Sequence, residues 1–93
     1  MGVLAKFTKQ PSERQDYDID YRAWLTQCAD TAVSYSADVE SGMTLNHSTL
    51  VDGVVKVWLS GGTSGSRYKV TVSITTAGGR VHEVEIVIVV KEV

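Results

Sequence analysis

Three aspartates at every second position offer the most obvious chemistry in the sequence. Asp16, Asp18 and Asp20 alternate with aromatic or apolar residues, and several carboxylates on one face are ligands that Ca²⁺ prefers. The segment lacks the glycine and the distal glutamate of the calcium-binding helix–loop–helix motif. We therefore expect a solvated strand face that discourages edge pairing, and no bound metal.

The other reactive side chains are scattered rather than grouped. His47 and His82 are the only histidines, and neither has Cys or Glu neighbours at metal-ligand spacing. Cys28 is the only cysteine, so an internal disulfide is excluded and a reducing site of synthesis is expected. The stretch 63–66 lacks the lysine of a phosphate-binding loop. We predict no catalytic residues, no enzyme activity and no cofactor.

Alternation of polar and apolar residues predicts the strands that position these side chains. Tyr17, Ile19 and Tyr21 share one face of the first clear strand. Trp24 and Leu25 follow this strand, and we expect their side chains to pack into the core at its end. No window predicts a helix. Further strands are expected at residues 31–37, 44–50, 54–60, 68–76 and 81–90, with a turn at 26–30 and a hairpin signal at Asp52-Gly53.

This spacing of short strands predicts an all-β fold, an immunoglobulin-like antiparallel β-sandwich of six to seven strands. Residues 1–15 are expected to form an N-terminal arm or edge strand, because Pro11 argues against a central strand. Residues 16–93 form the predicted sandwich domain. The cleanest alternation lies in residues 68–76 and 81–90. We expect one apolar set to face the other, either across the core or beside it: Tyr68, Val70, Val72 and Ile74 against Val84, Ile86 and Ile88.

Two strands depart from this alternation and supply the candidate interface. Trp58 lies on the same strand face as Lys56, so we expect it to be exposed, and exposed aromatic residues mark contact sites. Val87 and Val89 lie on a face that should be polar, so either the arm or a partner must cover them. If they share one outer face with Trp58, the three residues form an apolar patch.

Composition excludes two classes of partner. The chain has 93 residues, enough for one domain, and its net charge of −2 comes from nine basic and eleven acidic residues. No basic stripe is present to bind nucleic acid or an anionic membrane. The longest apolar run, residues 86–90, is too short to span a bilayer, and we expect no signal peptide.

Three segments resemble a known family. Residues 17–25 (YDIDYRAWL) and 55–63 (VKVWLSGGT) resemble the opening strand and a later segment of small phage fibre–tail adaptor proteins. Residues 68–72, followed by Gly79-Arg80-Val81, resemble the closing hairpin of that family. The resemblance implies a structural component of the virion of a tailed phage or prophage, which joins tail parts and has no catalytic residues.

We therefore expect a non-enzymatic assembly module that joins virion proteins through protein–protein contacts. Its expected partners are other virion tail proteins, with a homo-oligomer in the assembly as one option, and its expected location is the virion after synthesis in the bacterial host cytoplasm. The alternative is an immunoglobulin-like adhesion or glycan-binding module of a bacterial surface protein. Gene neighbourhood would separate the two.

Overall fold

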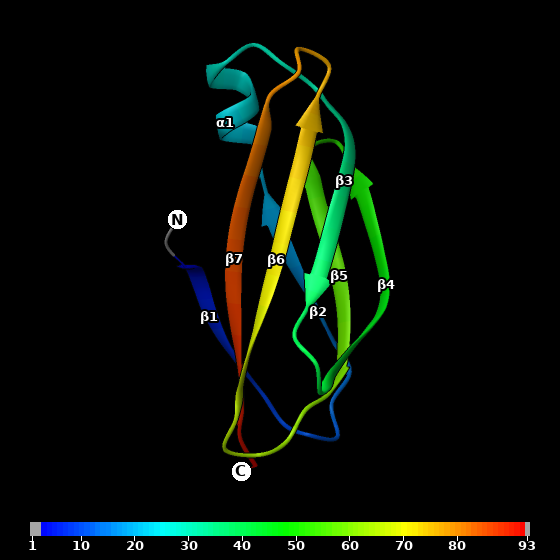
Figure 1. The fold of residues 1–93 in the computed structure, drawn as a ribbon, viewed down its shortest axis with the longest axis vertical. Coiled ribbons are helices and arrows are strands. Elements are labelled where there is room, and N and C mark those ends of the chain that lie inside the picture. The colour runs from blue at the N-terminus through cyan, green and yellow to red at the C-terminus, as the bar shows by residue number, and fades with distance from the viewer. Residues whose placement is uncertain (1–2, 93) are drawn as a thin grey trace.

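The computed structural model describes residues 3–92 and arranges them in two packed β-sheets (Figure 1). Strands β1, β7, β6 and β3 form a four-stranded sheet, and β2, β5 and β4 form a three-stranded sheet that lies behind it in the view of Figure 1. The elements are β1 (Val3–Lys9), β2 (Gln15–Asp20), α1 (Arg22–Gln27), β3 (Ala32–Val39), β4 (Met43–Val51), β5 (Val54–Gly61), β6 (Arg67–Thr76) and β7 (Val81–Val90). This arrangement confirms the predicted immunoglobulin-like sandwich.

The core lies between the two sheets and consists mainly of β-branched and leucine side chains. Burial of each such side chain contributes about 1.5–3 kcal/mol, which offsets the conformational entropy lost on folding. The predicted inward set Tyr17, Ile19 and Tyr21 is buried, as expected. Completely buried residues are Val55, Val57 and Leu59 on β5, Val70, Val72 and Ile74 on β6, and Ile88 and Val90 on β7.

Strands β6 and β7 pair antiparallel in the middle of the four-stranded sheet. Their register places Tyr68 opposite Ile88, Val70 opposite Ile86 and Val72 opposite Val84. The predicted partners therefore lie beside one another on the inner face of one sheet rather than across the core.

The prediction that the chain contains no helix is wrong at one place. Residues 22–27 form the short helix α1, which contains Trp24 and buries Leu25. Six residues are too few for helical apolar periodicity to show, although alanine, leucine, arginine and glutamine all favour a helix. No helix within residues 3–92 is long and apolar enough to span a membrane.

Residues 3–9 form β1, an edge strand that pairs with β7 in parallel, so the sandwich is not antiparallel throughout. The chain then crosses to the other sheet through a turn in which the Gln10 amide donates to Glu13 Oε1 at 2.8 Å. Lys9 is fully buried at this crossing, and its Nζ donates to the Gln10 carbonyl oxygen at 2.6 Å. Desolvation by burial lowers the pKa of Lys9, with Glu13 opposing this effect.

Replacing Ile86 by Asp should destabilise the domain severely, because it places an unpaired carboxylate in the core. The expected loss is on the order of 4 kcal/mol in the free energy of unfolding. Thr71→Lys is the matched control, since Thr71 is in register with Glu85 and Asp38 and should change stability by less than about 0.5 kcal/mol. Urea unfolding followed by far-ultraviolet circular dichroism measures both, and equal losses would contradict the assignment of faces.

Candidate functional site on the two outer sheet faces

Trp58 lies on the outer face of the three-stranded sheet. Its neighbours on β5, Val57 and Leu59, are completely buried, so the alternation of the strand directs Trp58 away from the core. It is partly exposed, and its partners in register are Asp16 on β2 and His47 on β4. Trp58 therefore points outward from the sheet, but it is partly exposed rather than fully exposed as expected.

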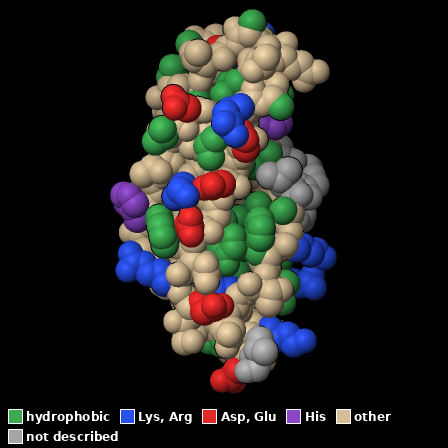
Figure 2. Space-filling view, turned by 180° about the vertical axis from the view of Figure 1, so that it is seen from behind, with side chains coloured by type: hydrophobic (Ala, Val, Ile, Leu, Met, Phe, Trp, Pro, Cys, Tyr) green, Lys and Arg blue, Asp and Glu red, His purple; other side chains and the backbone are tan. Residues whose placement is uncertain are grey.

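The three aspartates form a column on the same outer face, along the edge strand β2. Lys56 Nζ lies 2.9 Å from Asp16 Oδ2 and 3.2 Å from Asp18 Oδ1, and Arg22 Nη2 lies 2.7 Å from Asp20 Oδ2. Figure 2 views the molecule from this side and shows acidic and basic side chains next to one another down the face. Among residues 3–92, no group of three or more His, Cys, Asp or Glu side chains is placed to hold a metal ion.

These ion pairs lower the pKa values of two of the aspartates. The hydrogen bond from Lys56 lowers the pKa of Asp16, and the hydrogen bonds from Arg22 lower the pKa of Asp20 to about 2. All of the paired side chains are substantially exposed, so each pair contributes little to stability.

Val87 and Val89 lie on the outer face of the other, four-stranded sheet. Val87 is in register with Lys6 on β1 and Lys69 on β6, and Val89 is in register with Thr8 and Arg67. Val87 is only 8% exposed, and Val89 is partly exposed. The N-terminal strand therefore lies directly beside these valines, and cationic side chains flank them.

The three candidate interface residues do not form one patch. Trp58 belongs to the three-stranded sheet and the two valines to the four-stranded sheet, so they lie on opposite sides of the sandwich. The conditional expectation of a single apolar patch is wrong. Alternation along a strand shows on which side of its own sheet a residue lies, but it does not show to which sheet the strand belongs.

An aromatic cluster packs α1 against β7 at one end of the sandwich. The His82 ring stacks on Trp24 with centroids 4.5 Å apart and meets Tyr21 edge-on at 5.7 Å. The Tyr21 hydroxyl donates to the Val72 carbonyl oxygen at 2.9 Å. His82 is therefore half-buried and has a packing role, whereas His47 is exposed.

Asp30 joins the α1–β3 loop to the β6–β7 turn, a link that the sequence did not predict. Its carboxylate accepts hydrogen bonds from the amides of Thr31 and Gly78 at 2.8 and 3.1 Å, and from Arg80 Nη1 at 2.7 Å. The Thr76 hydroxyl, the Thr31 amide and Arg80 together lower the pKa of Asp30 to about 2. Forty-eight residues separate Asp30 from Gly78, so no local pattern indicates their contact.

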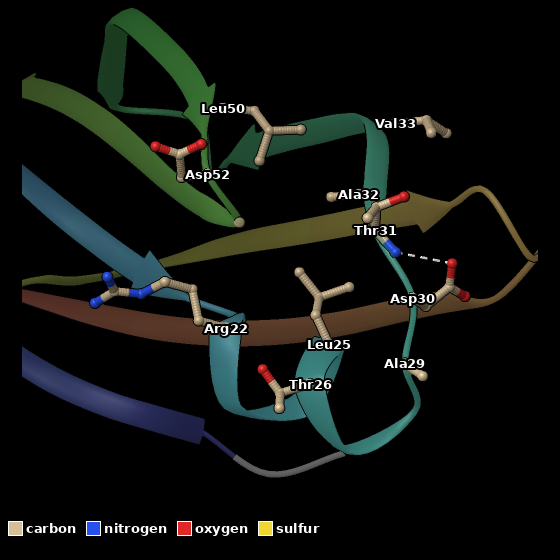
Figure 3. Close-up of a pocket in the computed structure, with 11 residues that line it drawn as sticks. Arg22, Leu25, Thr26, Ala29, Asp30, Thr31, Ala32, Val33, Leu50 and Asp52 are labelled. Carbon is tan, nitrogen blue, oxygen red and sulfur yellow. Dashed lines mark hydrogen bonds between the residues drawn. The ribbon is translucent and has the colours of Figure 1, made fainter.

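A cavity of about 900 Å³ opens at the same end, between α1, the start of β3 and the β4–β5 turn (Figure 3). Leu25, Ala32 and Leu50 provide its apolar wall, and Arg22 and Asp52 are among its polar lining residues. The predicted Asp52-Gly53 hairpin is confirmed: Gly53 has φ of +77°, and a Cβ there would lie 2.9 Å from Leu25 Cδ1. The cavity brings together no catalytic set of side chains.

The remaining reactive residues take part in local structure. The Thr63 amide donates to the Tyr68 hydroxyl at 2.9 Å, and the Ser66 amide donates to the Thr63 carbonyl oxygen at 3.1 Å, so residues 63–66 form a turn. Cys28 is a partly buried free thiol whose Sγ lies 3.7 Å from the Leu25 carbonyl oxygen.

Comparison with known families identifies the kind of protein. The family model described as podophage GP4 fiber-tail adaptor protein gp77 matches residues 9–89. The chain belongs to this family. No curated protein matches the chain.

The adaptor family match extends from the last residue of β1 to the penultimate residue of β7. Trp58, Val87 and Val89 all lie within it, whereas most of β1, including Lys6, lies outside it. The match assigns the adaptor a structural role in a phage tail and confirms the family resemblance seen in the sequence.

Acid should weaken the link between the loops of this adaptor. Because the pKa of Asp30 falls from 3.8 to about 2 on folding, its ionised form stabilises the fold above about pH 3.8. That stabilisation is lost as the pH falls towards 2. We expect Asp30→Asn to lower the melting temperature at pH 5–7, and the gap to wild type should shrink between about pH 4 and pH 2.

The control for this measurement is Asp38→Asn, which changes an exposed carboxylate on β3. The control should show a small gap in melting temperature at every pH. A gap for Asp30→Asn that stays constant down to pH 2 would contradict the role of the Asp30 charge.

Proposed function

We propose that this adaptor is a non-enzymatic structural module that joins proteins of a phage or prophage tail through protein–protein contacts. Family membership supports a structural role in the tail. The residues with reactive side chains support it as well, because the aspartates are ion-paired, His82 is stacked on Trp24 and residues 63–66 form a turn. The proposed partners are other virion tail proteins, with neither nucleic acid nor membrane involved.

The observation that carries this proposal is the presence of outward-facing apolar residues on both sides of one rigid sandwich. A protein that joins two bodies needs at least two contact surfaces. Trp58 provides an aromatic anchor on one outer face, and Val89 provides a partly exposed apolar residue on the other, next to Val87, which is only 8% exposed. Large aromatic residues at the centre of an interface, surrounded by polar residues, typically contribute most of the binding energy.

The core between the two faces fixes their relative orientation. Sheets in a sandwich pack about 10 Å apart, and the completely buried residues of β5, β6 and β7 leave no freedom for one sheet to slide over the other. A partner bound at Trp58 is therefore held at a set distance and angle from a partner bound at Val89. This rigidity suits a joining protein whose own chemistry is limited to contact.

The proposed place of action is the virion, after synthesis in the bacterial host cytoplasm. Here the adaptor needs no cofactor, since assembly depends only on complementary surfaces. Binding to other tail proteins also stabilises the folded adaptor by mass action, because the partners bind only its native state.

Incorporation into tails tests this proposal. Trp58→Ala should weaken assembly by about 2 kcal/mol or more, which is a loss of about 30-fold in affinity. Val87→Thr with Val89→Thr should also weaken it, because two hydroxyls replace methyl groups at the contact. The amount of adaptor in purified tails measures both effects, and thermal melting of the free domain checks that each variant folds.

Val81→Thr is the matched control for the double valine variant. Val81 lies on the same strand and the same outer face but is 68% exposed and distant from the flanking cations, so its replacement should leave incorporation unchanged. Trp58→Phe, which keeps an aromatic ring, should retain most of the affinity. Normal incorporation of a variant that combines Trp58→Ala, Val87→Thr and Val89→Thr would rule out both faces as docking sites.

A further inference from the structure

Strands β3 and β4 lie at facing edges of the two sheets, and the cavity at the α1 end opens between them. Within residues 3–92, each pairs only with a strand of its own sheet, and no backbone hydrogen bond joins β3 to β4. Partway along, the Tyr35 hydroxyl lies 2.8 Å from Ser48 Oγ and links the two edges. Beyond this link, towards the start of β3 and the end of β4, the cavity of about 900 Å³ occupies the space between the edges.

The floor of this cavity is apolar. Leu25 from α1, Ala32 from β3 and Leu50 from β4 point toward one another across it in Figure 3. Leu25 is buried, whereas Ala32 and Leu50 are partly exposed, and Val33, which also lines the cavity, is 60% exposed. Binding sites are typically cavities of roughly 300–1,000 Å³ with mainly apolar walls and a few polar groups, and this cavity has that form.

Asp52 supplies the cavity with a negative charge that has no ion-pair partner. Three charged residues line the cavity: Arg22, Asp30 and Asp52. Arg22 Nη2 lies 2.7 Å from Asp20 Oδ2, and Asp30 Oδ2 lies 2.7 Å from the guanidinium of Arg80. Among the residues that the structure describes, Asp52 is therefore the lining charge left without an ion pair. An occupant that combines an apolar group with a nearby cation is complementary to this site.

We infer that the cavity binds an extended segment of another tail protein, in which an aliphatic side chain is flanked by basic residues. This inference rests on the proposed function and names a further contact surface, at the end of the sandwich. The free edge of β3 offers backbone groups for pairing with the segment. The aliphatic side chain enters between Leu25 and Leu50, and a lysine or arginine reaches Asp52. At exposed strand edges, backbone pairing commonly supplies affinity and a side-chain pocket supplies specificity.

A synthetic peptide tests the chemistry of this site on the full chain. The probe is acetyl-Lys-Val-Leu-Val-Lys-amide, because an extended backbone places its leucine and both lysines on one side, whichever way the peptide runs. We expect saturable binding with a dissociation constant of about 1 mM. Amide chemical shifts in NMR spectra should change mainly within residues 25–33 and 50–53. Replacing the leucine by serine, or both lysines by glutamate, should weaken binding by about tenfold or more.

Variants of the chain separate the pocket from the charge. Ala32→Met fills the cavity, and Asp52→Asn removes the charge but keeps a residue type that tolerates the φ of +49° at this position. Each should weaken peptide binding by about tenfold and reduce incorporation into tails. Val33→Thr should weaken binding as well. Its matched control is Val81→Thr, since Val81 is 68% exposed but does not line the cavity. Melting temperatures of the free chain show that each variant folds.

Three results overturn the inference. The first is the absence of chemical-shift changes with the leucine peptide at about 5 mM. The second is equal binding of the leucine, serine and glutamate peptides, which shows non-specific adhesion. The third is normal incorporation into tails of folded Ala32→Met and Asp52→Asn chains. None of these results touches the proposed function, because Trp58→Ala and the double valine variant test it on the outer faces.

Discussion

Packing of the two inner sheet faces is the contact on which the other features of the adaptor depend. Because side chains alternate along a strand, burying Val55, Val57 and Leu59 on one sheet forces Trp58 to point outward from it. The same alternation on β7 directs Val87 outward from the other sheet while Ile86 and Ile88 fill the core. The core thus determines both the stability of the domain and the opposite directions of its two candidate contact surfaces.

Polar contacts at the ends of the strands fix the connecting loops, which lie outside the hydrophobic core. Asp30 links the α1–β3 loop to the β6–β7 turn, and the Tyr21 hydroxyl reaches across to the backbone of β6. A buried lysine, Lys9, donates to a backbone carbonyl where the chain crosses from one sheet to the other. These contacts restrict the loops at the ends of the sandwich.

Local patterns predicted much of this structure, and contacts distant in sequence account for what they missed. Alternation located most strands and placed Tyr17, Ile19 and Tyr21 in the core, and the resemblance of residues 17–25 and 55–63 indicated the family that the comparison confirmed. The short helix α1 escaped because six residues give no periodicity. The separation of Trp58 from the valines was unpredictable because strand pairing, which depends on the whole chain, decides to which sheet each strand belongs.

Oxidative footprinting of the two tryptophans is the most direct test of the central claim that the adaptor acts through its outer faces. Trp58 is partly exposed in the free domain, whereas Trp24 is stacked on His82 and serves as an internal reference. In assembled tails we predict that oxidation of Trp58 falls sharply relative to the free domain while oxidation of Trp24 changes little. Equal oxidation of Trp58 in the free domain and in tails would contradict the claim.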